Sequence, residues 1–595
     1  MIVPIRKYTF LVYHRDYDQF LDDLAELGVL HIVEKQTNLD NKTLEQLDQL
    51  KQVKEAITFL KQRDTEKKAS KTEEDGMELA RVIKEKRNKL EVFSQRHIAL
   101  IKEKLQAGPW GDFSKDTLDK LQQEGLNFKF YIISQKKFNP AWIQEHHVAA
   151  ISHHQSQVHF VVVNKEDEEA FEPPEAELVK LPKRPISAVM REHKQIEERI
   201  KKINEELDQF AGSAIPHLEE AAKRLETESE YKKAMLNTTE QANGKVKVLE
   251  GFVTVDRRNA LEEYLEKNHI LYLSRKPEPE DNPPIKLKNG KFARLFEPIA
   301  KLFALPSYKE LDLTPFFAPF FMLFFGFCLG DAGYGLIFII LGFIIKPKLK
   351  PDLKPIVSLA QFLGLGTVIF GVLTGTFFGM NLLQADIPAL ESVKSFMLNS
   401  QQAFYLAIII GVIQILFGIG VHAVNRTRQY GFKYALPQIG WLMLLPGLGL
   451  YFGFEALDLI GIILMFAGIF LIIFWSDPKA SIFGRIGKGL WDLYNITGVF
   501  GDVLSYIRLF ALGVSSAILG FVINDISMSI QSGLPYVGPV LMVIFLLIGH
   551  TANIFISSLG AFVHPMRLTF VEFYKNAGFS GGGIAYKPFK NKLKN

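Results

Sequence analysis

The spacing of apolar residues divides the chain into two regions. Residues 1–300 alternate short apolar runs with long charged stretches, whereas residues 314–575 consist largely of long apolar runs separated by short polar connections. A run of about 20 apolar residues is long enough to cross the hydrocarbon core of a bilayer as a helix. The pattern therefore predicts an α/β arm, a linker over 301–313 and an all-α polytopic membrane domain with two long tilted C-terminal helices.

Strand–helix–strand patterns occur near both ends of the arm. Over 5–34 the helix has Asp16 as a plausible N-cap and Gly28 as its C-terminal stop. The same pattern recurs over 246–274, and further strands fit "NFKFYIIS" and "VHFVVVN". We expect at least two small α/β lobes.

Two long charged stretches, about 41–106 and 186–240, carry apolar residues at spacings of three and four. That spacing places them on one face of a helix. Because the stretches separate the lobes, we expect an antiparallel coiled coil, with two separate solvated helices as the alternative. On the second stretch the apolar positions include Ile196, Ile200, Ile203, Leu207 and Phe210.

The first apolar block, 314–345, would be about 48 Å long as one helix, against a hydrocarbon core of about 30 Å. The lysine-rich "KPKLKPDLK" follows it, and such short loops prefer the cytoplasm. Two short crossings would keep these lysines inside. We therefore predict a hairpin that turns in "GDAGYG", at Gly330, Asp331, Gly333 and Gly335.

Eight membrane segments follow from the apolar runs. The predicted segments are 314–329, 333–346, 355–381, 400–424, 435–454, 457–475, 493–523 and 537–575.

Loop charges set the orientation of these segments. "NRTRQYGFK", "SDPKASIFGRIGKG" and the tail over 576–595 are rich in Lys and Arg, which places them inside. The loops expected outside, "LLQADIPALESV", "EALD" and "NDISMSIQSG", contain no arginine, and a single lysine, Lys394, directly follows the first of them. The first residues lack the apolar core of a signal peptide. We predict a multi-pass protein of the cell membrane with the arm and the tail in the cytoplasm.

Composition narrows the classes of function. The formal charge is +4, without a basic stripe interleaved with aromatics, so we expect no nucleic-acid partner. The single cysteine, Cys328, excludes an intrachain disulfide. There is no G-x-x-x-x-G-K-[ST] loop and no metal-spaced set of ligands. We predict no catalytic site, metal or cofactor in this chain.

Polar residues follow one face of each of the last two long segments. A mid-membrane arginine costs from about 3 to more than 10 kcal/mol, so it usually faces protein or water. We predict that Arg508 and Arg567 lie beside an ion path. The alternatives are an internal salt bridge, such as Arg508 with Asp502, and an Arg567 that reaches the lipid headgroups. Other candidate lining residues are Asp502, Ser505, Ser515, Ser516, His550, Asn553, Ser557, His564 and Glu572.

A guanidinium group keeps its proton at any relevant pH. It can attract a carboxylate that a partner carries past it, which promotes release of the ion bound to that carboxylate. A lysine could lose its charge in such a dry place.

Several of these motifs resemble one family. "SYIRLFALGVSSAIL" and "GAFVHPMRLTFVEFYKNAGFSGGG" are similar to the two long helices of the a/I subunit of rotary V-type and archaeal-type ATPases. "FFGFCLGDAGYG" and "LAELGVLHIVE" also resemble it, so the resemblance covers nearly the whole chain. The length is closer to that of bacterial members.

The resemblance implies the stator ion-channel subunit, which couples proton or sodium translocation to rotation and to ATP hydrolysis or synthesis. Two offset half-channels would meet a ring of rotor subunits, each with one carboxylate. Arg508 matches the family's essential arginine, and Arg567 matches the arginine that assists it. The arm would contact peripheral-stalk subunits, and the soluble ATPase sector would be an indirect partner.

Two departures from the family pattern leave the identity of the transported ion open. Ser516 stands where eukaryotic relatives often have His, and Ser557 stands where many relatives have Glu. Sodium is therefore an alternative to the proton.

Two other classes of function compete. A stand-alone ion-coupled secondary transporter would need its own deep acid, for which Asp331 and Asp502 are candidates. A non-transporting membrane scaffold would explain the arm but not Arg508.

Overall fold

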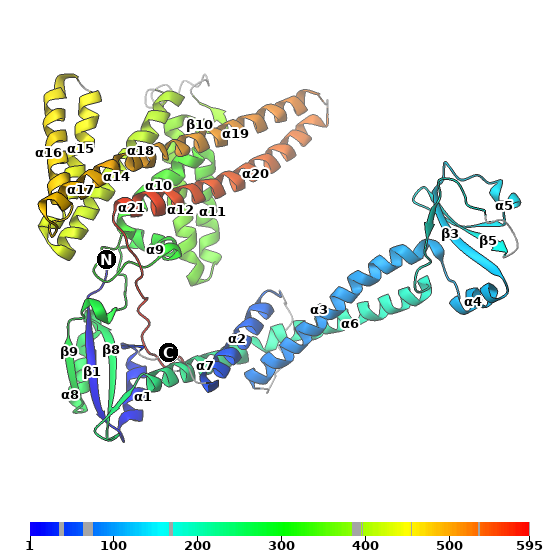
Figure 1. Ribbon diagram of the computed structural model, residues 1–595, viewed down its shortest axis with the longest axis horizontal. Coiled ribbons are helices and arrows are strands. Elements are labelled where there is room, and N and C mark those ends of the chain that lie inside the picture. The colour runs from blue at the N-terminus through cyan, green and yellow to red at the C-terminus, as the bar shows by residue number, and fades with distance from the viewer. Residues whose placement is uncertain are drawn as a thin grey trace. The chain divides into compact units, whose positions relative to one another are not determined.

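The computed structural model describes residues 1–34, 41–63, 75–165, 171–382, 394, 397–453, 455–533 and 536–593 (Figure 1). It forms two compact units. Unit 1 comprises 1–12, 29–33 and 246–588, and unit 2 comprises 13–28, 34–245 and 589–595. Unit 1 therefore contains the apolar helices together with strands from both ends of the arm.

One sheet in unit 1 contains strands from both strand–helix–strand patterns. Its order is β2 (His31–Ile32), β8 (Val246–Thr254), β1 (Ile5–Tyr13), β9 (Leu271–Arg275). β1 and β9 are antiparallel, and buried positions recur along β1. The helix α8 (Arg258–Lys267) buries Leu261 and Leu265. The two patterns thus join in one sheet instead of forming a lobe each.

A second, four-stranded antiparallel sheet lies in unit 2. Its order is β4 (Val148–His154), β5 (Gln157–Lys165), β3 (Leu126–Ser134), β6 (Glu177–Val179). β3 and β5 are the strands expected from "NFKFYIIS" and "VHFVVVN", and they pair along the whole of β3. Tyr131, Val158 and Phe160 are in the core. The short helices α4 (Lys115–Gln123) and α5 (Trp142–Glu145) complete this lobe.

Four helices of unit 2 pack in pairs, α3 (Gly76–Ala107) with α6 (Ile186–Ser213) and α2 (Asn41–Lys61) with α7 (Ile215–Leu236). Ion pairs give the direction of α3 and α6. Lys86 pairs with Glu206 and Arg96 pairs with Glu192, so one helix rises in number as the other falls. The pair is therefore antiparallel.

The apolar face predicted on 186–240 is the packing face of α6. Ile196 and Leu207 are buried, and Ile200, Ile203 and Phe210 pack against the same clusters. Residues 64–74 of the predicted stretch 41–106 lie outside the described residues. A continuous coiled coil stays a prediction, since α6 and α7 are separate helices.

Five helices of unit 1, among the described residues, are long and apolar enough to cross a membrane. They are Lys354–Thr374, Ser400–Tyr430, Glu455–Trp475, Ile482–Gly533 and Gly538–Asn576, and a shorter apolar helix spans Thr314–Leu329. The count of eight segments stays a prediction.

In order, the helices of this region of unit 1 are α9 (Lys291–Phe303), α10 (Thr314–Leu329), α11 (Ala332–Ile345), α12 (Lys354–Thr374), α14 (Ser400–Tyr430), α15 (Leu436–Gly453), α16 (Asp458–Trp475), α17 (Ile482–Tyr494), α18 (Ile496–Leu504), α19 (Ile507–Gly533), α20 (Gly538–Arg567), η9 (Leu568–Phe573) and α21 (Tyr574–Asn576).

Several boundaries differ from the sequence-based segments. α14 runs to Tyr430 and α19 to Gly533, beyond the expected ends at 424 and 523. α12 ends at Thr374, before the expected end at 381, and the hairpin β10 (Thr376–Phe377) and β11 (Met380–Asn381) follows. The segment expected over 493–523 is divided between α18 and α19. The last segment changes at Leu568 from an α-helix to the π-helical turn η9. Of the outer loop "LLQADIPALESV", residues 383–393 lie outside the described residues.

Aromatic side chains of α10 form the centre of the apolar core in unit 1. Phe317, Phe321 and Phe324 are fully buried, and α10 packs against α12, α19 and α20. Elsewhere helices approach through glycines. A Cβ atom added to Gly447 on α15 would lie 3.0 Å from the Gly461 carbonyl oxygen on α16. Such small residues allow two membrane helices to approach closely.

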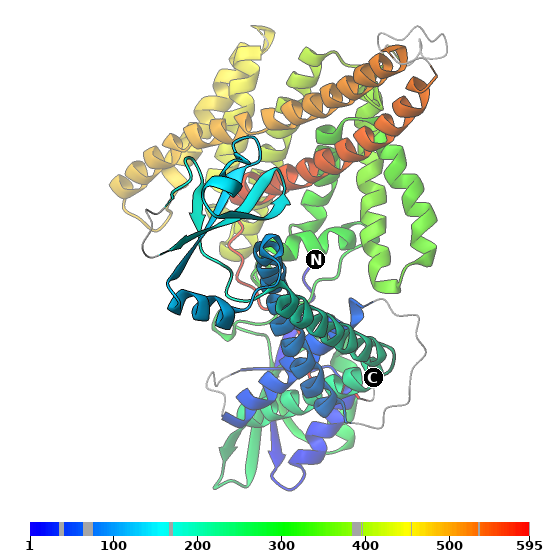
Figure 2. The same cartoon turned by 90° about the vertical axis from the view of Figure 1, so that its right-hand side faces the viewer.

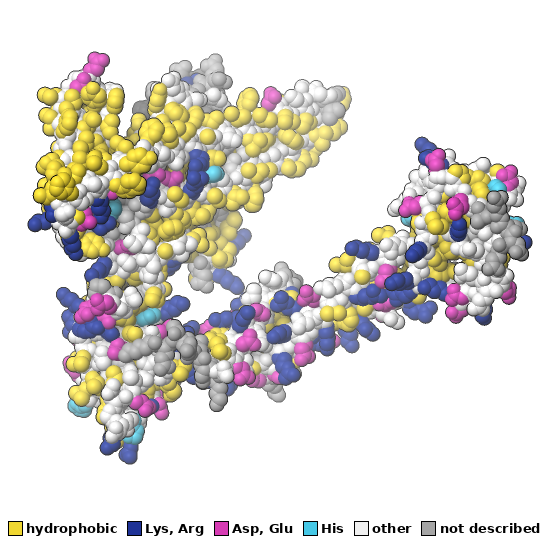
Figure 3. Space-filling view, in the orientation of Figure 1, with side chains coloured by type: hydrophobic (Ala, Val, Ile, Leu, Met, Phe, Trp, Pro, Cys, Tyr) yellow, Lys and Arg dark blue, Asp and Glu magenta, His cyan; other side chains and the backbone are white. Residues whose placement is uncertain are grey.

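The surface of unit 1 is apolar over α15, α16, α19 and α20 (Figure 3). Phe466 and Phe470 on α16 and Phe555 on α20 are exposed. Exposed apolar area of this extent marks a membrane or protein contact. The helices of unit 2 instead carry charges of both signs (Figure 3).

Candidate functional site

The two long helices α19 and α20 run side by side (Figures 1 and 2). On α20, Asn553 is buried and His550 and Ser557 are half-buried, whereas Phe555 and Leu559 are exposed. The polar face predicted from the 3–4 spacing is therefore turned toward the protein, and the apolar face is turned outward.

The turn between α10 and α11 is built on Asp331. Gly330 ends α10 with a φ of 56°, a conformation that glycine adopts without strain. Asp331 Oδ1 accepts hydrogen bonds from the backbone N–H groups of Gly333 and Tyr334, at 2.8 and 3.2 Å. The turn consists of Gly330 and Asp331, because Gly333 and Gly335 lie within α11.

Asp331 also holds the β10–β11 hairpin. Its carboxylate accepts the N–H groups of Phe378 at 2.9 Å and Gly379 at 2.8 Å. The side chain is only 1% exposed. Both oxygens of this buried carboxylate are thus occupied by backbone donors.

A polar network joins α11, α19 and α20, which we call the Tyr334 network (Tyr334, Asn524, His550, Asn553 and Ser557). The Tyr334 hydroxyl lies 2.8 Å from His550 Nδ1 and accepts from Asn553 Nδ2 at 2.9 Å. His550 Nε2 lies 3.0 Å from Asn524 Oδ1. Ser557 donates to Asn553 Oδ1 at 2.8 Å. The network brings together three of the predicted lining residues, His550, Asn553 and Ser557.

A second group, the Asp502 cluster (Asp502, Glu572, Lys575 and Asn576), lies where α18 meets η9 and α21. Lys575 Nζ lies 3.0 and 3.2 Å from the two Asp502 carboxylate oxygens. Asn576 Nδ2 donates to Asp502 Oδ2 at 3.0 Å and to the backbone carbonyl of Glu572 at 2.7 Å. The cluster therefore fastens α18 to the end of the last long helix.

Arg508 lies near the start of α19 and is half-buried. Its Nη1 atom is buried and has no hydrogen-bond partner among the described residues. In the same part of the chain, Asp502 pairs with Lys575 and no ion pair joins it to Arg508. The proposed internal bridge between Arg508 and Asp502 is thus not formed.

Arg567 lies exposed at the end of α20. His564, one turn earlier, lies within electrostatic range of both Arg508 and Arg567. His564 therefore lies near both arginines.

The remaining candidates differ in their surroundings. Ser516 is buried, and its Oγ has no partner among the described residues; the same holds for Glu572 Oε2. Ser515 is exposed on α19. The Ser505 hydroxyl donates to the Gly501 carbonyl at 3.1 Å.

Sequence reasoning missed several polar groups that complete these clusters. Tyr334 and Asn524 connect His550 to two other helices, and Gln414 Oε1 on α14 accepts the Tyr506 hydroxyl at 2.6 Å. Asn524 and Gln414 interrupt apolar runs. That interruption is the signal that could have found them.

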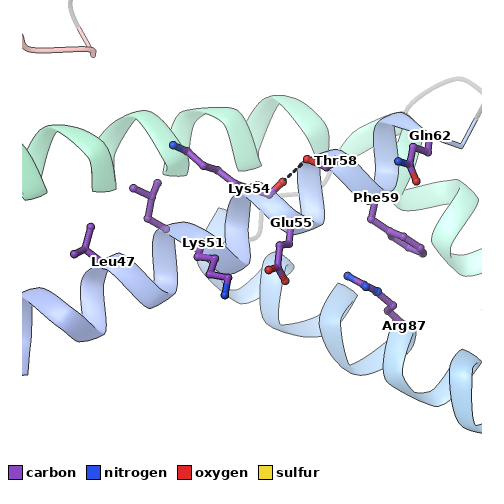
Figure 4. A pocket seen from close by; sticks show the side chains of 9 residues that line it. Leu47, Lys51, Lys54, Glu55, Thr58, Phe59, Gln62 and Arg87 are labelled. Atoms are coloured by element: carbon purple, nitrogen blue, oxygen red, sulfur yellow. Dashed lines mark hydrogen bonds between the residues drawn. The ribbon is translucent and has the colours of Figure 1, made fainter. Parts of the chain in front are cut away.

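Further cavities lie among the described residues, and two of them are large. One of about 480 Å³ lies beside α19 in unit 1, with Gly330, Thr374 and Phe510 in its wall. The other, about 630 Å³, is a groove between α2 and α3 in unit 2 (Figure 4). There Lys51 and Glu55 project from α2, and Arg87 of α3 lies over the Phe59 ring at 5.6 Å. The described residues contain no group of three or more metal-ligating side chains.

Comparison with known proteins shows what the chain is similar to. No family model matches it. It is 26% identical to V-type ATP synthase subunit I of Borreliella burgdorferi over 638 residues, covering 100% of both chains. It is 31% identical to A-type ATP synthase subunit I of Methanocaldococcus jannaschii over 347 residues, which is 53% of this chain and 50% of that protein.

One solved structure, the cytoplasmic N-terminal domain of subunit I, homolog of subunit a, of V-ATPase, covers 45% of this chain at 16% identity with a TM-score of 0.21. The similarity to the Borreliella burgdorferi protein extends over the whole length, whereas that to the Methanocaldococcus jannaschii protein covers about half of each chain. These relatives confirm the resemblance of the chain to subunit I of V-type and A-type ATP synthases.

Proposed function

We propose that this chain is the stator subunit of a rotary V-type ATPase or ATP synthase. It would form ion half-channels against a rotor ring and couple H⁺ or Na⁺ translocation to rotation and to ATP hydrolysis or synthesis. The observation that carries the proposal is the buried Arg508 Nη1 without a partner among the described residues. An uncompensated buried charge is costly, so we expect its partner to be a carboxylate of a rotor subunit.

The two polar groups lie on either side of Arg508 along the chain. The Asp502 cluster contacts α18 just before it, and the Tyr334 network contacts α19 at Asn524, well after it. Such an arrangement suits two offset half-channels. An ion could pass from one to the other only while bound to a rotor subunit. We assign the cytoplasmic half-channel to the Asp502 cluster and the outer one to the Tyr334 network.

This assignment also implies where the other parts of the chain lie. The arm and the tail would lie in the cytoplasm, with the membrane domain crossing eight times. The names of the sequence relatives support a place in a rotary ATPase. The arm would contact peripheral-stalk subunits, and the soluble ATPase sector would be reached indirectly.

A stand-alone carrier is less well supported. Its coupling acid would be Asp331 or Asp502, yet Asp331 is bound by four backbone N–H groups and Asp502 is paired with Lys575. A scaffold without transport gives no reason for the buried arginine.

Replacing Arg508 tests the proposal. In vesicles that contain the assembled complex, Arg508→Ala should abolish ATP-driven ion uptake because the rotor carboxylate loses its counter-charge. Arg508→Lys should do the same, since an ammonium group can lose its proton in a dry site. Arg567→Ala should weaken uptake less. Normal coupled uptake in either Arg508 variant would refute the assignment.

The same vesicles identify the ion. Uptake that requires Na⁺ and survives a protonophore would mark a sodium pump. Acidification that is independent of Na⁺ and collapses with the protonophore would mark a proton pump.

A further inference from the structure

The two carboxyl groups of the Asp502 cluster have very different surroundings. Asp502 is 13% exposed on its side chain and receives two contacts from Lys575 Nζ and one hydrogen bond from Asn576 Nδ2. Glu572 is 2% exposed, and its Oε2 atom has no partner among the described residues. One carboxyl group is therefore held by a cation and an amide, whereas the other has a free oxygen in a buried place.

The backbone around Glu572 is also unusual. Glu572 lies in the π-helical turn η9, where the Tyr574 N–H bonds to the Thr569 carbonyl. Single π-helical turns inside α-helices are rare and often occur at functional sites. Thr569 Oγ1, in the same turn, is also buried without a partner among the described residues. This turn thus presents two unfilled polar groups.

We propose that Glu572 is the acid that takes up and releases the transported ion on the inner side, while Asp502, paired with Lys575, is a positioning residue. The inference deepens the stator function proposed above and rests on it. With H⁺ as cargo, the Glu572 carboxylate forms one O–H bond with an incoming proton and breaks it when the proton moves on. With Na⁺, the same oxygen coordinates the ion and then releases it.

Energetics support this division of roles. A proton or ion that binds Asp502 must displace Lys575 and break the charge-assisted bonds that it makes. A buried carboxylate with a free oxygen gains from binding a cation, because its own charge is costly there. Among the described residues, Arg567, Asp502 and Tyr506 lie within electrostatic range of Glu572, and the Ser505 side chain lies within hydrogen-bonding reach of its carboxyl group. Arg567 is exposed, and its charge favours release of the bound ion.

Asp502 has a mechanical role in this scheme. Asn576 donates to both Asp502 and the Glu572 backbone carbonyl, so Asp502 fixes the turn that holds Glu572. Loss of this anchor should reduce transport through misplacement of Glu572, and additional removal of the lysine left unpaired should restore most of it.

Transport by variants of the full complex tests the proposal. We expect Glu572→Gln to lower ATP-driven uptake at least about tenfold, as for loss of a proton-transfer group. Glu572→Asp should retain part of the rate with a shifted pH profile. Asp502→Asn should cost about two- to threefold, and Asp502→Asn with Lys575→Gln should recover most of this loss. Asp525→Asn, an exposed carboxylate on α19, is the matched control and should transport normally.

A second measurement does not depend on turnover. A hydrophobic carbodiimide reacts with protonated carboxyl groups, so it should label Glu572 and spare Asp502 in the purified complex. Protection of Glu572 by Na⁺ would identify sodium as the cargo, and labelling that depends only on pH would identify the proton.

The outcomes separate this inference from the function on which it rests. Wild-type transport in Glu572→Gln, or labelling of Asp502 in place of Glu572, would overturn the inference. If Arg508→Ala is inactive in the same assay, the stator function still stands. Full transport in Arg508→Ala would overturn the stator function itself.

Discussion

The hydroxyl group of Tyr334 is shared by two side chains of α20. It lies 2.8 Å from His550 Nδ1 and accepts a bond from Asn553 Nδ2, and the ring itself is fully buried. A buried polar group that loses its partner costs about 1–3 kcal/mol. At the scale of single residues, this hydroxyl therefore holds α11 against α20.

Tyr334→Phe should lower the thermal stability of the purified complex, because it leaves polar atoms of His550 and Asn553 with fewer partners. We expect a loss of about 1–3 kcal/mol and slower ion uptake. Tyr405→Phe, in which the removed hydroxyl comes from an exposed ring on α14, is the control. Equal melting temperatures for the two variants would show that the shared hydroxyl contributes nothing.

The sequence predicted which polar residues share one face of α20, but it did not predict the residues on other helices that they contact. The 3–4 spacing on a continuous helix was enough to place His550, Asn553 and Ser557 on one face. Tyr334 and Asn524 could not be assigned to them, because spacing along one helix says nothing about which other helices are its neighbours. The contact between Asp502 and Lys575 depends on the same missing information.

At the scale of elements, apolar runs predicted the positions of helices but not their ends. The run over 355–381 is apolar almost throughout, yet Gly375 and Gly379 take positive φ values and the chain turns there. The break between α18 and α19 lies inside another apolar run. Hydropathy measures the cost of exposing side chains to water. It does not detect a turn whose side chains are apolar and buried among other helices.

The α3–α6 pair has an ion-pair group that should respond to pH. Hydrogen bonds from Arg96 and Arg184 lower the pKa of the Glu192 carboxyl group from 4.5 to about 2. A lowered pKa in the folded state adds stability above the unfolded value, and that stability is lost as the pH falls. The contribution is thus complete above about pH 4.5 and disappears toward about pH 2.

Hydrogen exchange of the full-length chain measures this effect. Amides of α3 and α6 near Glu192 should lose about 1 kcal/mol of protection between neutral and acid pH, and Glu192→Gln should flatten that dependence. Glu198→Gln, an exposed position on α6, serves as the control. A slope unchanged in Glu192→Gln would assign the pH response to other groups.

At the scale of the molecule, the residues after the last long helix return to the sheet of unit 1. Ser580 and Gly581 donate their N–H groups to the buried Glu310 carboxylate, at 2.9 and 3.3 Å. Further on, Tyr586 N–H bonds to the Ile285 carbonyl at 2.9 Å, and the Tyr586 hydroxyl donates to the Val29 carbonyl. The membrane helices and the sheet are therefore joined at both ends of the apolar region.

Tyr586→Ala should loosen this second connection without affecting the helices. It removes the hydroxyl bond to Val29 and the ring contact with His31, so β2 should exchange its amides faster while α19 and α20 keep their protection. Lys587→Ala is the matched control, since Lys587 is exposed and meets His31 through its backbone. Hydrogen exchange with mass spectrometry on the intact complex resolves the segments. Equal exchange of β2 in both variants would mean that the Tyr586 side chain adds nothing to the connection between tail and sheet, whereas faster exchange in Tyr586→Ala alone would show that it stabilises this connection.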